Sequence, residues 1–153
     1  MSFDRTMAWR VTTALAFCAL VPAESAMGAS AHYVADLDPA PMTLATRPDL
    51  TGEGSITADL DGSILQVRGN FAGLSSPALD ARLQAASAAG LPGSVVADLD
   101  VTKAANGTIS GSVKLTRAQA ESLRKGGLYV QIDTAKSHPP YGTLWGFFLP
   151  PEQ

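Results

Sequence analysis

The chain has 153 residues, of which 46% are hydrophobic and 16% charged, and its formal net charge is −3 at pH 7. This length fits one domain that can bury a proper core. The mildly acidic balance argues against nucleic acid or an anionic membrane as the main partner. A single cysteine, Cys18, excludes an internal disulfide, so the core alone must hold the domain together.

The N-terminal residues have the layout of a secretory signal peptide. Arg5 and Arg10 are followed by an apolar or small stretch over residues 11–21, which matches a positive n-region and a short h-region. The stretch is shorter than the roughly 20 residues that a membrane-spanning helix needs. We therefore expect export and no transmembrane segment. Cys18 lies within the stretch, but the large Phe17 before it disfavours a lipidation site.

Small residues after this stretch predict where the signal is cleaved. Residues 29–31 read Ala-Ser-Ala, an A-x-A site that would leave His32 at the new N-terminus. Cleavage after Ala26 or after the first of these alanines is also open. We expect residues 1–31 to be a cleaved signal peptide and residues 32–153 to form one domain in the periplasm.

Apolar and polar residues alternate over residues 54–60 and 65–71, which is the pattern of two half-buried strands. The Asp-Gly pair at positions 61–62 is a signal for a two-residue hairpin turn. That turn would set Ala58 opposite Leu65, and both apolar sets would then share one face.

A second hairpin is predicted from residues 94–103 and 108–115. The Asn-Gly pair at 106–107 looks like a two-residue turn, but that register would set Leu115 against Asp98 and bury carboxylates. We therefore expect a register shifted by one, with a loop of about three residues. The side chains expected to face the core are Val95, Ala97, Leu99, Val101, Ile109, Val113 and Leu115.

Four further strands are predicted, at residues 33–37, 80–85, 128–134 and 143–149. A short helix follows the second hairpin, where Thr116 and Gln119 have capping-box spacing and the Gly-Gly pair at 126–127 ends the helix. Eight short strands with turn signals between them predict an all-β fold. We expect a single antiparallel β-sandwich, Ig-like in type, with one short helix.

Five short motifs spread over most of the chain carry a family resemblance. They read YVADL at 33–37, GLPGSVV at 90–96, LTRAQ at 115–119, GGLYVQIDT at 126–134 and YGTLWG at 141–146. In this order they resemble the CHRD (chordin-type) domain, a β-sandwich module of secreted animal proteins and bacterial exported proteins. The resemblance implies the same fold for residues 32–153.

The resemblance also implies where a polar cluster would lie. Family members typically carry a His-x-His pair on the middle strand, a histidine after the Tyr-Val strand and an arginine before the glycine of the last strand. In this chain those positions fall on Arg82 and Gln84, on Asp133 and on Trp145. Guanidinium and amide groups cannot replace the neutral ring nitrogen that binds metals. We expect Arg82 and Asp133 to form a structural ion pair across the sheet.

Candidate catalytic or metal-binding side chains are few. His32 and His138 are the only histidines, and the sequence has no nucleophile elbow, phosphate-binding loop or paired-histidine motif. We expect no catalytic residue, no metal site and no cofactor. One alternative is copper, bound by the ring and freed amine of His32 with His138 or an aspartate. Another is calcium at the alternating aspartates of residues 59–61 or 98–100.

The last predicted strand is apolar on both faces, whereas the other strands alternate. One face can pack against the core, and the other needs cover from a loop, the helix or a partner protein. Trp145, Phe147 and Leu149 are therefore candidates for a partner interface.

In size, export and general character the chain is similar to the small third subunit of membrane-bound quinohaemoprotein alcohol dehydrogenases. The likeness implies a non-catalytic accessory subunit on the outer face of the inner membrane. Its partners would be the large pyrroloquinoline-quinone subunit and a cytochrome c. The alternative is a free periplasmic binding domain for a metal ion or a small ligand.

Overall fold

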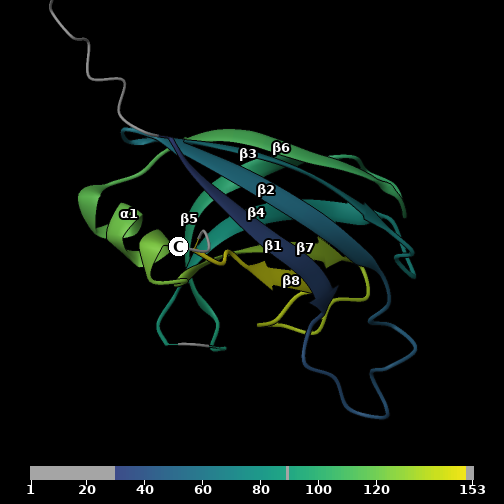
Figure 1. The fold of residues 1–153 in the computed structure, drawn as a ribbon. Coiled ribbons are helices and arrows are strands. Elements are labelled where there is room, and N and C mark those ends of the chain that lie inside the picture. The colour runs from purple at the N-terminus through teal and green to yellow at the C-terminus, as the bar shows by residue number, and fades with distance from the viewer. Residues whose placement is uncertain (1–29, 89, 151–153) are drawn as a thin grey trace, which may run out of the picture.

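The computed structural model describes residues 30–88 and 90–150, in which eight strands and one helix are formed (Figure 1). The expected signal peptide lies outside the described residues apart from its last two positions. The elements in chain order are β1 (Ala31–Pro39), β2 (Glu53–Asp61), β3 (Ile64–Ala72), β4 (Ala78–Ala86), β5 (Gly93–Val101), β6 (Gly107–Lys114), α1 (Arg117–Arg124), β7 (Leu128–Thr134) and β8 (Leu144–Phe147).

The β2–β3 hairpin has the predicted alternation but a different turn. The two turn residues are Gly62 and Ser63, one position later than predicted. Ala58 therefore lies opposite Val67 rather than Leu65. Gly62 has a φ of 58°, the left-handed conformation that glycine adopts readily at the first position of a type II′ turn. The pairing moved by two residues, so both apolar sets still face inward.

The β5–β6 hairpin avoids the register of a two-residue Asn-Gly turn, as predicted, but the shift is three residues rather than one, because Val101 pairs with Ile109 instead of Ser112. One expectation within β5 was wrong, since Val95 is 51% exposed. The register between β4 and β5 shifts at this point, with Val96 as the extra residue in β5. A bulge reverses the faces of the residues before it. Val96 therefore packs against the core in place of Val95.

The eight strands close into an antiparallel barrel in the order β1-β2-β3-β6-β5-β4-β7-β8 (Figure 1). The prediction of an all-β antiparallel fold was right, but the prediction of a sandwich was wrong. Two short ladders close the barrel: β5 joins β6 at Asp100 and Val101, and β1 joins β8 at Asp38 and Pro39. A sandwich and a barrel require the same alternation along each strand. Only pairing at these seams removes the free edges that a sandwich would have.

The helix α1 lies at one end of the barrel, between β6 and β7 (Figure 1). Its predicted start is confirmed, because Thr116 and Gln119 form a capping box. Ala120 and Leu123 are buried in the core, and Gly126 follows the helix with a φ of 74°. No helix in the described part of the chain is long and apolar enough to cross a membrane.

Strands β1 and β8 approach each other closely at their seam. Gly146 of β8 is buried there, and a Cβ atom added to it would lie 2.3 Å from the carbonyl oxygen of Asp36. Real Cβ atoms do not approach a backbone oxygen so closely, so only glycine permits this contact. The seam therefore depends on the absence of a side chain at this position.

We predict that Gly146→Ala forces β8 away from β1 and lowers the free energy of unfolding by about 1–3 kcal/mol. Urea denaturation followed by tryptophan fluorescence measures the change. Ser55→Ala, at an exposed position of β2, is the control and should leave the midpoint nearly unchanged. Equal midpoints for the two variants would contradict a tight seam.

Candidate functional site

The outer faces of β4, β7 and β8 carry most of the residues that the sequence singled out. Along these strands the alternate residues, such as Leu83 and Val130, point into the core. Two rows of cross-strand neighbours face outward, and Asp133 lies one step further along β7. We call these seven residues the outer cluster: Arg82, Gln131 and Trp145 in the first row, Gln84, Tyr129 and Phe147 in the second, and Asp133.

The polar half of the outer cluster is centred on Arg82. Its Nη2 donates to Asp133 Oδ2, and its Nε donates to Asp80 Oδ1 at 3.1 Å. Gln131 Nε2 donates to both carboxylate oxygens of Asp133 at 3.2 Å. Burial lowers the pKa of Arg82, but the carboxylates of Asp133 and Asp80 outweigh it, so the pKa is raised. The group is therefore a fixed cation whose charge these carboxylates balance.

The aromatic half of the outer cluster surrounds Tyr129, which is fully buried. Phe147 stacks on its ring with 4.7 Å between centroids, and Trp145 meets the ring edge-on at 5.9 Å. The Tyr129 hydroxyl donates to Gln84 Oε1 at 2.8 Å and accepts from the amide of Gly93 at 3.0 Å. The aromatic side chains of β8 thus supply much of the cover that the outer face of β7 requires.

The structure brings together all four positions that the family resemblance assigned to a polar cluster: Arg82, Gln84, Asp133 and Trp145. Their donors do not fit a transition metal, because no imidazole is present and the Asp133 carboxylate is already bound by Arg82. Within the described residues no group of three or more His, Cys, Asp and Glu side chains could hold a metal ion. The arrangement can rigidify the sheet and present aromatic surface.

The two histidines lie far apart, one at the start of β1 and the other in a loop near the end of that strand. His32, at the start of β1, donates a hydrogen bond from Nδ1 to Asp59 Oδ1 at 2.7 Å. His138 lies in the β7–β8 loop, and its Nε2 is 3.6 Å from Asp49 Oδ2. The length of a nine-residue strand separates them. They therefore cannot share the copper ion that the sequence left open.

The three interface candidates differ in exposure. Trp145 and Phe147 are half-buried against Tyr129, whereas Leu149 is 62% exposed. The amide of Leu149 donates to the carbonyl oxygen of Val34 at 2.9 Å, and Val34 is 44% exposed. We call these four residues the C-terminal strip: Val34, Trp145, Phe147 and Leu149. The sequence analysis did not identify Val34 as an interface candidate. Its position in β1 predicts only that it faces outward, and its pairing with Leu149 is known only from the structure.

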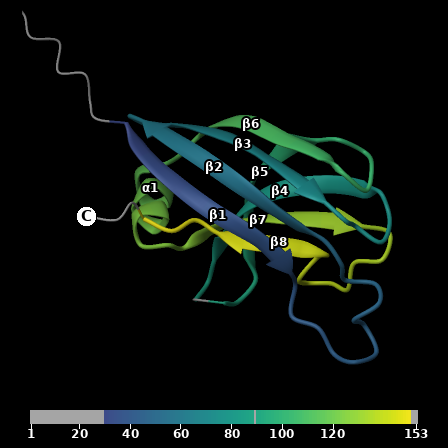
Figure 2. The same ribbon diagram turned by 45° about the vertical axis from the view of Figure 1, so that its right-hand side comes forward.

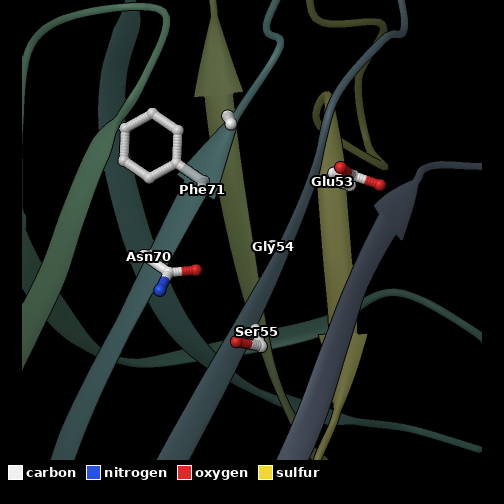
Figure 3. Close-up of a pocket in the computed structure, with 6 residues that line it drawn as sticks. Glu53, Gly54, Ser55, Asn70 and Phe71 are labelled. Carbon is white, nitrogen blue, oxygen red and sulfur yellow. The ribbon is translucent and has the colours of Figure 1, made fainter.

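Another surface feature is an open depression on the outside of β2 and β3 (Figure 3). Glu53, Ser55 and Asn70 line it with exposed polar side chains. The ring of Phe71 is buried in the core. Glu53 is the one acidic or basic side chain among the residues that line the depression. The depression therefore offers no pair of groups for acid–base catalysis.

Residues 24–146 match the family model described as the CHRD domain. The chain belongs to the CHRD domain family. This membership confirms the resemblance read from the five motifs, and it covers all the strands up to the middle of β8. No curated protein and no solved structure matches the chain.

We predict that Tyr129→Phe destabilises this CHRD domain by about 1–3 kcal/mol, because it leaves the Gln84 carbonyl and the Gly93 amide without their shared partner. Urea denaturation at pH 7 measures the loss. Tyr141→Phe is the matched control, since the Tyr141 hydroxyl makes no hydrogen bond to another described residue. Similar midpoints for both variants would contradict a structural role of the buried hydroxyl.

The same variant tests a pH dependence. Burial raises the pKa of Tyr129. Because the folded pKa then exceeds the unfolded value of about 10, stability is full below pH 10 and falls as the pH rises through the folded pKa. The wild type should therefore lose stability more steeply above pH 10 than Tyr129→Phe. Parallel losses in urea midpoints across this range would show that Tyr129 ionises freely.

Proposed function

We propose that this chain is a non-catalytic exported accessory protein that binds a larger protein through the C-terminal strip. The observation that carries the proposal is the exposure of Leu149 and Val34, at 62% and 44%, next to the half-buried rings of Trp145 and Phe147. Large apolar and aromatic side chains gathered on one surface are typical anchors of protein interfaces.

Barrel closure supports binding through side chains. An open sheet could accept an extra strand from a partner at its edge. In this barrel β8 is paired with β1 on one side and with β7 on the other. A partner would therefore contact the outward side chains of the strip and not the backbone of an edge strand.

The charges beside the strip specify the partner's surface. Asp36 and Asp38 are exposed on the outer face of β1, the same face that carries Val34. Asp38 lies directly opposite Trp145. The complementary surface would be an apolar hollow bordered by lysine or arginine side chains.

Our proposal for the partner is a periplasmic, membrane-associated dehydrogenase of the quinohaemoprotein alcohol dehydrogenase type, with its quinoprotein subunit and its cytochrome c. The chain's small size and its expected export support this choice. The accessory role would be to stabilise the complex, with no cofactor held by this chain.

Export is tested by the N-terminus of the protein recovered from the periplasm. We predict that mass spectrometry finds a chain beginning at His32, because residues 29–31 form the A-x-A site. A chain that begins at Met1 would contradict export through a cleaved signal.

Pull-down of the tagged protein from detergent-solubilised membranes of its native host tests the partner. We predict recovery of the quinoprotein subunit and the cytochrome, and a loss of about tenfold or more with Leu149→Asp. Ile64→Asp is the matched control, because Ile64 is also partly exposed but lies at the β2–β3 turn.

Three other outcomes would change the proposal. A monodisperse monomer alone would contradict an accessory role. Recovery that Leu149→Asp leaves intact would reject the C-terminal strip as the docking surface. Recovery of a different protein, lost with Leu149→Asp, would keep the strip and reject the dehydrogenase.

A further inference from the structure

The loop between β1 and β2 holds apolar side chains out in solvent. Leu44 is 88% exposed, more than any other large apolar side chain in the described part of the chain, and Met42 is 41% exposed. Pro41 and Ala45 beside them are also exposed. Two large apolar side chains at a loop tip are unfavourable in water unless something else covers them.

Hydrogen bonds hold the loop in this conformation. The amide of Thr43 donates to Thr46 Oγ1 at 2.9 Å, and the amide of Thr46 donates to Thr43 Oγ1 at 3.3 Å. The amide of Arg47 donates to the carbonyl oxygen of Thr43 at 3.0 Å. Leu50, at the base of the loop, is buried. The tip is therefore presented by a built turn.

The loop projects well beyond the barrel, and the turn that precedes β5 projects on the same side (Figures 1 and 2). Leu91, in that turn, is 49% exposed. Each of these two projections thus carries an exposed leucine. A flat apolar medium could contact both tips at once.

The charges around the first loop suit a lipid surface. Arg47 is exposed and makes no ion pair with another described residue. Lys136 Nζ, in the β7–β8 loop, lies 3.6 Å from Asp49 Oδ1 at the base of the same loop. Because Asp49 balances the charge of Lys136, Arg47 is the cation that can meet phosphate headgroups while the apolar side chains enter the acyl boundary.

A protein partner fits the loop tip less well. A stable protein interface buries at least about 1,000 Å² with good shape complementarity, and a narrow projection with two large apolar side chains offers much less. A bilayer requires no shape complementarity. We propose that Leu44 and Met42 insert into the headgroup region of a phospholipid bilayer and make this protein a peripheral membrane protein.

The net charge of −3 gives this proposal a distinctive signature. An acidic protein gains little from the overall attraction of an anionic surface, so the apolar side chains must supply most of the affinity. Binding should therefore survive high salt. The inference stands apart from the accessory role, since it concerns other side chains and another kind of partner.

Co-sedimentation with vesicles of phosphatidylethanolamine and phosphatidylglycerol tests the proposal. The processed protein is used, with its N-terminus verified by mass spectrometry, so that the apolar stretch of residues 11–21 is absent. We expect Leu44→Asp to lower the ratio of bound to free protein about tenfold. Ile64→Asp, which makes the same change of charge at the start of β3, should bind like the wild type.

Thermal melting first establishes that both variants fold, as expected for exposed positions. Wild-type binding that persists at high salt and is lost with Leu44→Asp supports insertion. The proposal is overturned when the wild type stays in the supernatant, when Leu44→Asp sediments like the wild type, or when salt alone removes the binding. The pull-down through Leu149 is unaffected by any of these results.

Discussion

Pairing of β8 with β1 is the constraint on which the rest of this molecule depends. β8 has only four residues, and it joins β1 at Asp38 and Pro39, with one further bridge between Val34 and Leu149. Gly146 allows this close approach. The pairing closes the barrel and also fixes the direction of Trp145, Phe147 and Leu149, because successive strand residues alternate between faces. Closure and the candidate interface are therefore set by the same few backbone contacts.

The second constraint is that β7 is buried on both faces. Its inner face packs in the barrel, whereas the outer face lies under the rings of Trp145 and Phe147 and beside the β7–β8 loop. Gly142 of that loop lies so close to Gln131 that an added Cβ atom would come within 2.6 Å of its Cγ. Gln131 Oε1 is buried without a hydrogen-bond partner among the described residues. The amide is thus held by one end, through Asp133.

Membership of the CHRD domain family gives the chain a domain type, and the side chains give the functional argument. The polar positions that the resemblance pointed to hold an ion-pair network without imidazole. Surface chemistry lies elsewhere, on the C-terminal strip and on the loop tip that carries Leu44. We propose a protein partner for the first surface and a lipid bilayer for the second, and a protein that binds both would stand at a membrane beside its partner.

The sequence by itself determined the strands, the helix with its capping box and the rejection of a two-residue Asn-Gly turn in the β5–β6 hairpin, although not the size of the register shift there. Each of these follows from interactions between residues close in the chain, where alternation, turn chemistry and capping act. The CHRD motifs were readable for the same reason. The β2–β3 turn lies one residue later than predicted. The apolar pattern could not distinguish the two turns, because an Asp-Gly turn and a Gly-Ser turn keep the same residues facing inward.

Only the tertiary structure decided between a barrel and a sandwich, since closure depends on pairs such as Asp38 with Trp145 that lie more than a hundred positions apart. The tertiary structure also placed Val95 on the outer face of β5 instead of the inner face, because the position of a bulge depends on the partner strand. The burial of Tyr129 on the outer face and the adjacency of Val34 and Leu149 belong to the same class. Alternation along a strand predicts which residues face outward. Which other residues cover them depends on strands that only folding brings together.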